Sequence, residues 1–153
     1  KFKILVDYAP EPQSLKHLYK AIELLPKQRL IHVIGSWGVG RDIVRQPILG
    51  ELAGQKANIV IVTNEDPYDD DPQKIIDNVA TGAIKAGKEL DKDLFKILNR
   101  RKAIKKALIL AEDNDLVLIT GKGAEQFICG ANGKKIAHDD RQVVRDLLKI
   151  FKK

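Results

Sequence analysis

Residues 58–72, with the sequence NIVIVTNEDPYDDDP, join a short apolar run to an acidic loop. The run at residues 59–62 consists of β-branched apolar residues, which is typical of a strand buried on both faces of a parallel sheet. The loop contains five carboxylates and two prolines, and the apolar residues after it recur with a helical period. This order of strand, loop and helix predicts an α/β domain, in which ligands bind beyond the carboxyl ends of the strands.

The acidic loop allows two interpretations. Its carboxylates could receive a cation at the edge of the sheet. Alternatively, Asp71 caps the following helix, Pro72 occupies the first turn, and the other carboxylates favour the positive end of that helix. The loop by itself favours the capping interpretation.

The same unit recurs along the chain. Strands are expected at residues 3–6, 30–34, 94–98 and 115–120, and helices after Pro12, from Pro47, after Pro72, over residues 100–111 and after a cap at Asp139 or Asp140. Ile48 and Ile84 are expected to point inward, and residues 82–93 resemble a mobile connection. Residues 126–137 predict a hairpin with Asn132-Gly133 as a type I′ turn. The pattern indicates a three-layer α/β domain with a mostly parallel sheet flanked by helices and a C-terminal hairpin.

Length and composition bound the class of protein. A chain of 153 residues is sufficient for one domain, residues 1–153, with its own core. No apolar run approaches the roughly 18 residues of a membrane span, and no signal peptide is visible, so a cytoplasmic protein without a membrane partner is expected. The single Cys129 excludes an internal disulfide. The chain begins at Lys1 and contains no Met, which suggests a piece of a longer or processed protein.

The net charge of +6 makes an anionic partner plausible, either a nucleotide, a nucleic acid or an acidic ligand. Lys102, Lys105 and Lys106 are expected on the outer face of their helix. No aromatic residues are interspersed with them, so a solvated face is favoured over a nucleic-acid contact. His32 lies inside a predicted strand and is interpreted as a core or sheet-surface histidine, in preference to a catalytic one.

Four loops, at residues 7–12, 35–42, 64–71 and 121–125, follow predicted strands and are expected to meet at one edge of the sheet. The glycines at residues 35–42 match neither the dinucleotide fingerprint nor the P-loop, and a plain turn explains them equally well. No nucleophile–base pair and no cluster with metal-ligand spacing is evident, so no catalytic or metal-binding residue is assigned. The loops predict a recognition surface more than a self-sufficient catalyst.

Five segments resemble, in order and spacing, the C-terminal domain of the Mur ligase family. They are VDYAPEPQSL at 6–15, GRDIVRQPILGE at 40–51, TNEDPYDDDP at 63–72, GKGAE at 121–125 and DDR at 139–141. The resemblance covers essentially the whole chain and is greatest to the UDP-N-acetylmuramoyl-tripeptide synthetases, which add the third amino acid of the peptidoglycan stem peptide. It implies a Rossmann-like sheet, in agreement with the pattern of strands and helices.

The resemblance also implies a division of labour between domains. In this family a central domain with the P-loop holds ATP and Mg²⁺, a first domain holds the UDP-sugar, and the C-terminal domain delivers the amino acid. The carboxylate of the UDP-MurNAc-peptide becomes an acyl phosphate, which the incoming amine attacks. This chain contains no P-loop and therefore resembles the third domain alone, without the other two. We expect the isolated chain to fold, to bind no cofactor of its own and to be inactive.

Site residues follow from the family motifs. Asp7 and Tyr8 match the nucleotide-facing residues of VDYAH. The residues that match amino-acid-binding positions are Arg41, Glu65, Asp66, Tyr68, Gly121 and Glu125. Arg41 corresponds to the arginine that reaches the carboxylate of the amino acid. Glu65 to Tyr68 occupy the D-N-P-R box, which in the family recognises the side chain of the amino acid. Gly121 and Glu125 belong to the G-K-G-H-E motif.

Several positions depart from the family pattern. Pro10, Gln46 and Ala124 stand where the family has His, Arg and His, and each change removes a polar group. Tyr68 replaces the arginine that pairs with the distal carboxylate of diaminopimelate, which predicts a lysine-like amino acid. The main hypothesis is therefore the C-terminal domain of an ATP-dependent amide ligase. The alternatives are a decayed or altered binding module without turnover and, third, a nucleic-acid binder.

Overall fold

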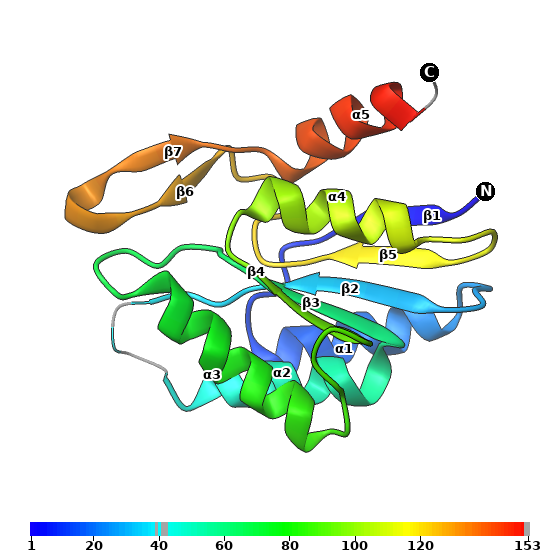
Figure 1. Cartoon of the computed structure of the whole chain (residues 1–153), viewed down its shortest axis with the longest axis horizontal. Helices are drawn as coiled ribbons and strands as arrows, with labels where there is room; N and C mark the ends of the chain where they lie inside the picture. Colours follow the sequence, from blue (N-terminus) through cyan, green and yellow to red (C-terminus); the bar gives the residue numbers. More distant parts are fainter. Residues whose placement is uncertain (39, 41–42, 152–153) are drawn as a thin grey trace.

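The computed structural model describes residues 1–38, 40 and 43–151. Its centre is a sheet of five strands in the order β1-β5-β2-β3-β4, and every neighbouring pair is parallel (Figure 1). The strands are β1 (Lys3–Val6), β2 (Leu30–Ile34), β3 (Ile59–Thr63), β4 (Leu94–Ile97) and β5 (Leu116–Ile119). The predicted strands and their parallel arrangement are confirmed.

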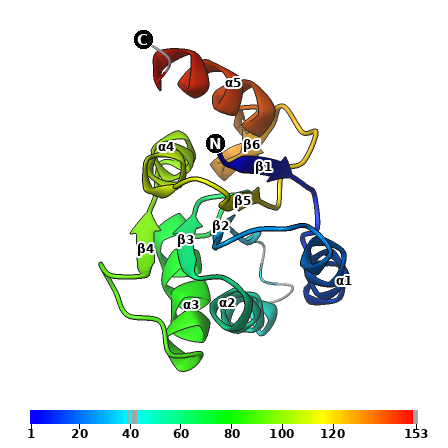
Figure 2. The same cartoon turned by 90° about the vertical axis from the view of Figure 1, so that its right-hand side faces the viewer.

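Helices cover both faces of the sheet and form three layers, as predicted (Figures 1 and 2). The helices on one face are α1 (Pro12–Glu23), α2 (Arg45–Lys56) and α3 (Pro72–Lys85), and those on the other are α4 (Arg100–Leu110) and α5 (Asp140–Phe151). Alternate residues of β2 separate the two cores, because Leu30 and Ile34 pack under α1–α3 whereas Ile31 and Val33 pack under α4 and α5.

Helices α2 and α3 pack closely through glycines. A Cβ atom at Gly50 would overlap the carbonyl oxygen of Val79, and one at Gly82 would overlap that of Pro47. Their backbones are therefore in direct contact, which no larger residue would permit. This contact determines which helix faces are buried, and it bears on the predictions for Ile48 and Ile84.

The predictions for Ile48, Ile84 and residues 82–93 are wrong. Ile48 is 40% exposed and Ile84 is 46% exposed. The cause is the close contact of the two helices, in which Gly50, Gly54 and Gly82 face the neighbouring helix and leave Ile48 and Ile84 outside the contact. Residues 82–85 belong to α3, so the predicted mobile connection begins later. Helix α2 also begins at Arg45, before Pro47.

His32, a buried polar residue of the central strand β2, has a hydrogen-bond partner for each of its ring nitrogens. His32 lies between the Tyr19 hydroxyl, 2.7 Å from its Nδ1, and the Thr120 hydroxyl, 2.9 Å from its Nε2. Desolvation lowers the pKa of His32 to about 3, so the ring is neutral at physiological pH. His32 is a core histidine, as predicted.

The hairpin predicted at residues 126–137 is present. Strands β6 (Phe127–Cys129) and β7 (Lys135–Ala137) pair antiparallel, and a short 3₁₀ turn, η1 (Ala131–Gly133), joins them. Asn132 and Gly133 both have positive φ angles, of 54° and 70°, as a type I′ turn requires. The hairpin projects from the carboxyl edge of the sheet, whereas both termini lie at the opposite end (Figure 1).

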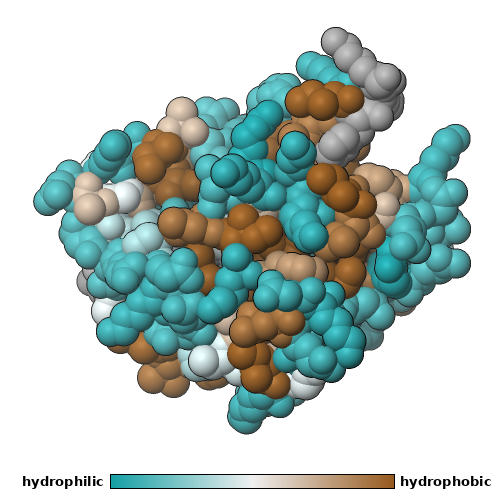
Figure 3. All heavy atoms as spheres, in the orientation of Figure 1, coloured by the Kyte–Doolittle hydropathy of each residue, from teal (hydrophilic) through white to brown (hydrophobic). Residues whose placement is uncertain are grey.

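Polar side chains are interspersed with apolar ones over the face shown in Figure 3. Lys102 and Lys105 are exposed, whereas the ammonium group of Lys106 lies 4.7 Å from the centre of the Phe95 ring. Among the described residues, no helix has both the length and the apolar character needed to cross a membrane.

Candidate functional site

The loops that follow β1, β2, β3 and β5 meet at the carboxyl edge of the sheet, as the sequence predicts. The Gly121 N–H donates to the Tyr8 carbonyl oxygen at 2.9 Å, which joins the loops after β5 and β1. The Gly38 N–H donates to the Asp66 carbonyl oxygen at 2.8 Å, which joins the loops after β2 and β3. These backbone hydrogen bonds therefore join the four loops in two pairs.

Four of the five carboxylates in the acidic loop accept hydrogen bonds from the protein itself. Asp71 accepts from the Gln73 N–H at 2.8 Å and so caps α3, as predicted. Asp69 accepts from the Asn132 N–H of the hairpin at 2.7 Å. Asp70 accepts from the Gly40 N–H at 3.3 Å. These three aspartates therefore fix the loop to its neighbours, which supports the capping interpretation over a cation-binding loop.

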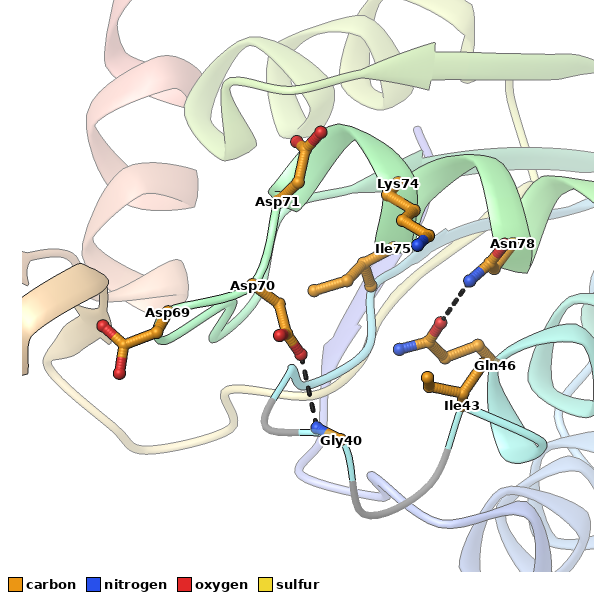
Figure 4. A pocket seen from close by; sticks show the side chains of 9 residues that line it. All are labelled: Gly40, Ile43, Gln46, Asp69, Asp70, Asp71, Lys74, Ile75 and Asn78. Atoms are coloured by element: carbon orange, nitrogen blue, oxygen red, sulfur yellow. Dashed lines mark hydrogen bonds between the residues drawn. The ribbon is translucent and has the colours of Figure 1, made fainter.

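Asp69, Asp70 and Asp71 line a cavity of about 260 Å³ between the loop, the start of α2 and α3 (Figure 4). In Figure 4 Asp70 points toward Gly40, whereas Asp69 and Asp71 point away. Gln46 occupies the opposite wall, accepts a hydrogen bond from the Asn78 side chain at 2.9 Å and donates one to the Trp37 carbonyl oxygen at 3.1 Å. Gln46 therefore ties α2 to α3 and to the loop after β2.

Asp66 is buried and fully paired. Both of its carboxylate oxygens accept from the Lys122 ammonium group at 2.9 Å, and one also accepts from the Cys129 N–H at 2.7 Å. Lys122 itself is fully buried and lies 2.7 Å from a Glu125 carboxylate oxygen. Burial alone would lower the pKa of Lys122, but its pairing with Asp66 and Glu125 outweighs burial and raises it. This buried ion cluster connects the loops after β3 and β5 with the hairpin.

Glu65 differs from the other carboxylates of the loop. It is only 2% exposed, and its Oε1 atom has no hydrogen-bond partner among the described residues. A Cβ atom at Gly121 would overlap the Glu65 carboxylate, and the φ angle of Gly121, 106°, also favours glycine at this position. Desolvation raises the pKa of Glu65 to about 7, and nearby Asp66 adds to the increase. Of the two buried carboxylates of the loop, Glu65 and Asp66, Glu65 is therefore the one with an oxygen that lacks a partner among the described residues.

Tyr8 and Trp37 form an aromatic pair beside Glu65. Their ring centres are 6.5 Å apart, and the Arg45 guanidinium lies 4.7 Å from the centre of the Trp37 ring. Tyr8 is 45% exposed, and burial together with the Glu125 and Glu65 charges raises the pKa of its phenol. The neighbouring Asp7 accepts a hydrogen bond from the Ala9 N–H at 3.0 Å. Tyr8 therefore offers an accessible ring at this edge of the sheet.

Tyr68 follows the acidic pair with a positive φ angle of 51°. Its N–H donates to the Cys129 carbonyl oxygen at 3.1 Å, so the hairpin holds it in this conformation. Burial, followed by the Asp66 charge, raises the pKa of the Tyr68 phenol. Arg41, which the sequence assigns to the amino-acid carboxylate, lies outside the described residues.

A second buried ion pair lies behind the loops. Arg100, 2% exposed, donates two hydrogen bonds to Asp140, at 2.9 and 2.7 Å. It also donates to the carbonyl oxygens of Asn64, at 3.1 Å, and Thr120, at 2.8 Å, and so supports the loops after β3 and β5. Although burial opposes ionisation of Asp140, Arg100 lowers its pKa well below the ordinary value. Asp139, not Asp140, caps α5, because its carboxylate accepts from the Arg141 N–H at 2.9 Å.

Sequence reasoning missed Lys122, Trp37 and Arg100. Lys122 stands between two glycines directly after a predicted buried strand, in a loop expected at the same edge of the sheet as the acidic loop. That signal could have identified it. Within the described ranges, no three His, Cys, Asp or Glu residues are grouped so that they could hold a metal ion.

The parallel sheet and the meeting of its loops define the class of protein, a Rossmann-like α/β domain whose polar loops meet at the carboxyl edge. The profile of the family described as "Mur ligase, glutamate ligase domain" matches residues 1–123. The chain therefore belongs to the Mur ligase family, and it forms the C-terminal domain of that family's ligases.

Similar proteins of known name support this assignment. The chain is 36% identical over 148 residues to a UDP-N-acetylmuramoyl-L-alanyl-D-glutamate--2,6-diaminopimelate ligase of Aquifex aeolicus, a match that covers 97% of the chain and 29% of that protein. It is 40% identical over 127 residues to a UDP-N-acetylmuramyl-tripeptide synthetase of Roseiflexus sp., covering 83% of the chain and 25% of the relative. A solved structure of a 2,6-diaminopimelate ligase superposes with a TM-score of 0.84 at 30% identity, covering 98% of the chain and 30% of that structure. The chain thus spans less than a third of the length of these proteins.

Replacing Glu65 with Gln is expected to change how stability depends on pH. The pKa of Glu65 is raised from 4.5 to about 7 in the folded chain, so the unfolded chain releases this proton at a lower pH. The stability that the group contributes is therefore present below its unfolded pKa of 4.5 and is lost as the pH rises through about 7. The loss is on the order of 2 kcal/mol, and Glu65→Gln should abolish it.

Urea unfolding of both proteins at about pH 5 and about pH 8 measures this effect. All other titrating groups are shared, so the difference between the two proteins isolates Glu65. Parallel pH profiles for the variant and the wild type would contradict a raised pKa at this position.

Proposed function

We propose that this chain is the amino-acid-delivering domain of an ATP-dependent amide ligase of peptidoglycan precursor synthesis. Its substrates would be a UDP-MurNAc-peptide and a free amino acid, and its partners the other domains of the parent ligase. The names of the relatives support this class of reaction. The observation that carries the proposal is Glu65, a buried carboxylate with an unused acceptor at the edge where the four loops meet.

The site residues have separate proposed roles. Glu65 would accept a hydrogen bond from the side-chain ammonium group of the amino acid, with Glu125 nearby. Gly121 would leave space for Glu65, and Tyr68 would lie beside the side chain of the bound amino acid. Asp66 would organise the loop. Arg41 remains the proposed partner of the amino-acid carboxylate.

ATP would activate the peptide carboxylate for attack by the incoming amine. The half-exposed Tyr8 ring could stack against the nucleotide base, with Asp7 holding the turn beneath it. The described residues do not fit the phosphates or Mg²⁺, because Lys122 is buried in its own ion cluster and no metal-ligand group is present among them. Those contacts are therefore assigned to the other domains, and the isolated chain is proposed to be inactive.

We further propose a lysine-like amino acid as the substrate. The relatives are named for diaminopimelate or for an unspecified tripeptide product. In this chain Tyr68 carries no positive charge to pair with a second carboxylate, and Glu65 would repel one. An ammonium group alone would be favoured there.

Ligation by the full-length parent enzyme tests this proposal, with lysine and meso-diaminopimelate as competing substrates. We expect kcat/KM to favour lysine by at least about tenfold, because a close carboxylate pair is strongly disfavoured at a desolvated site. Glu65→Gln should reduce that preference, whereas Glu112→Gln, an exposed substitution far along the chain, should not. A preference for diaminopimelate in the wild-type enzyme would overturn the assignment of lysine.

A binding module without turnover is the second candidate. It is favoured by Gln46, whose side-chain amide bonds to Asn78 and to the Trp37 carbonyl oxygen, and by Pro10 and Ala124, which offer no polar side-chain group at the site. Amino-acid binding by the full-length protein without any ligation product, in the same assay, would favour this candidate.

A further inference from the structure

Lys122 lies among the carboxylates of the proposed amino-acid site. Its side chain is fully buried, and its ammonium group is 2.9 Å from both carboxylate oxygens of Asp66 and 2.7 Å from Glu125. The Phe127 ring, whose centre is 5.8 Å from the ammonium group, covers it from the hairpin side. The cluster therefore already contains one ammonium group, supplied by the protein.

Because Lys122 pairs with Asp66, the carboxylates of Asp66 and Glu65 are not equally available to a ligand. Asp66 accepts three hydrogen bonds, two from Lys122 and one from the Cys129 N–H, and is 3% exposed. A ligand ammonium could reach it only by displacing Lys122 from a buried pair, which is strongly unfavourable. Glu65 is equally buried, at 2% exposed, but one of its oxygens has no partner among the described residues, so no described ion pair has to be broken before a ligand ammonium pairs with it.

We propose that Lys122 is a positioning residue, which occupies Asp66 so that Glu65, and not Asp66, recognises the ammonium group of the incoming amino acid. This inference rests on the proposed function. It adds that Asp66 does not contact the amino acid, although it lies in the loop proposed to recognise the side chain, because Asp66 is paired with Lys122. It also explains why removing Asp66 alone is a poor test of recognition, since that change leaves a buried Lys122 without its partner.

The test compares lysine with norleucine, which has the same chain length without the ammonium group, as substrates of the full-length ligase. The ratio of kcat/KM for lysine to that for norleucine measures ammonium recognition and is insensitive to a general loss of active protein. The double variant Asp66→Asn/Lys122→Met should keep this ratio within about threefold of wild type, because it removes a balanced pair. Glu65→Gln should lower the ratio by at least about tenfold, because it removes a charged acceptor.

A double variant that loses the lysine preference as fully as Glu65→Gln would overturn the inference, because Asp66 would then read the ligand directly. If that double variant does not fold, Asp66→Leu/Lys122→Met replaces the pair with apolar residues and carries the same expectation. Lys122→Arg, which keeps the charge, should also keep the ratio. A wild-type enzyme that does not distinguish lysine from norleucine would overturn the proposed lysine substrate itself, whereas a lysine preference that only the double variant loses would overturn this inference alone.

Discussion

Replacing Asp140 with Asn is expected to lower the free energy of unfolding by about 3 kcal/mol or more. Asp140 is fully buried and accepts two hydrogen bonds from Arg100, which is 2% exposed. The asparagine would keep the shape of the side chain but leave the Arg100 charge buried without a counterion. The expected loss of stability therefore comes from the missing negative charge and not from a change in packing.

Urea unfolding followed by circular dichroism measures this loss, and Asp146→Asn is the matched control. Asp146 is on the same helix, is 41% exposed, and lies 3.9 Å from Lys149. Because exposed pairs contribute little, this control should change stability by less than about 0.5 kcal/mol. If both variants unfold at the same urea concentration, the buried pair does not stabilise the fold as argued.

The Asp140 variant should also loosen the site. Arg100 donates hydrogen bonds to the carbonyl oxygens of Asn64 and Thr120, at the ends of β3 and β5, and Asp140 holds the guanidinium in place for these contacts. Faster amide hydrogen exchange in residues 64–71 and 121–125 would accompany the loss of stability. Unchanged exchange in both loops would mean that the Arg100–Asp140 pair does not stabilise the loops of the site.

Replacing Gly50 with Ala is expected to destabilise the chain by about 2 kcal/mol or more, although the same change in an isolated helix stabilises it by about 1 kcal/mol. The added methyl group would overlap the carbonyl oxygen of Val79, which is a backbone atom and cannot rotate away. Helices α2 and α3 would have to separate, and apolar residues such as Leu49 and Ile76 would lose part of their packing.

Thermal unfolding measures this effect, and Gln55→Ala on the exposed face of α2 is the control. The control should leave the melting temperature nearly unchanged, because Gln and Ala both favour helices. A Gly50→Ala variant with a raised melting temperature would behave like a solvent-exposed helical glycine and would contradict the close contact of α2 and α3.

Local patterns were sufficient to predict the elements of the fold. Four consecutive β-branched residues at 59–62 can form a buried strand but not an amphipathic helix, and Asp71-Pro72 can begin a helix from its own side chains. The Asn132-Gly133 turn is equally local, because both residues tolerate positive φ angles. Parallel order then follows from the alternation of strands and helices.

The tertiary structure decided how side chains are shared between distant loops. The sequence places five carboxylates in one loop. It does not indicate that Lys122 pairs with Asp66, which is 56 positions away in the chain, or that Arg100 pairs with Asp140. It also does not show that glycines turn Ile48 and Ile84 outward.

The reason for this difference is the range of the interactions involved. Helix caps, turns and apolar periods depend on residues within a few positions of each other, so the sequence by itself determined the strands, the helices and the edge where the loops meet. Ion pairing and burial depend on which loops the folded chain brings within about 3 Å. Only the tertiary structure therefore decided that Asp66 is occupied by Lys122 and that Glu65 keeps an unused acceptor.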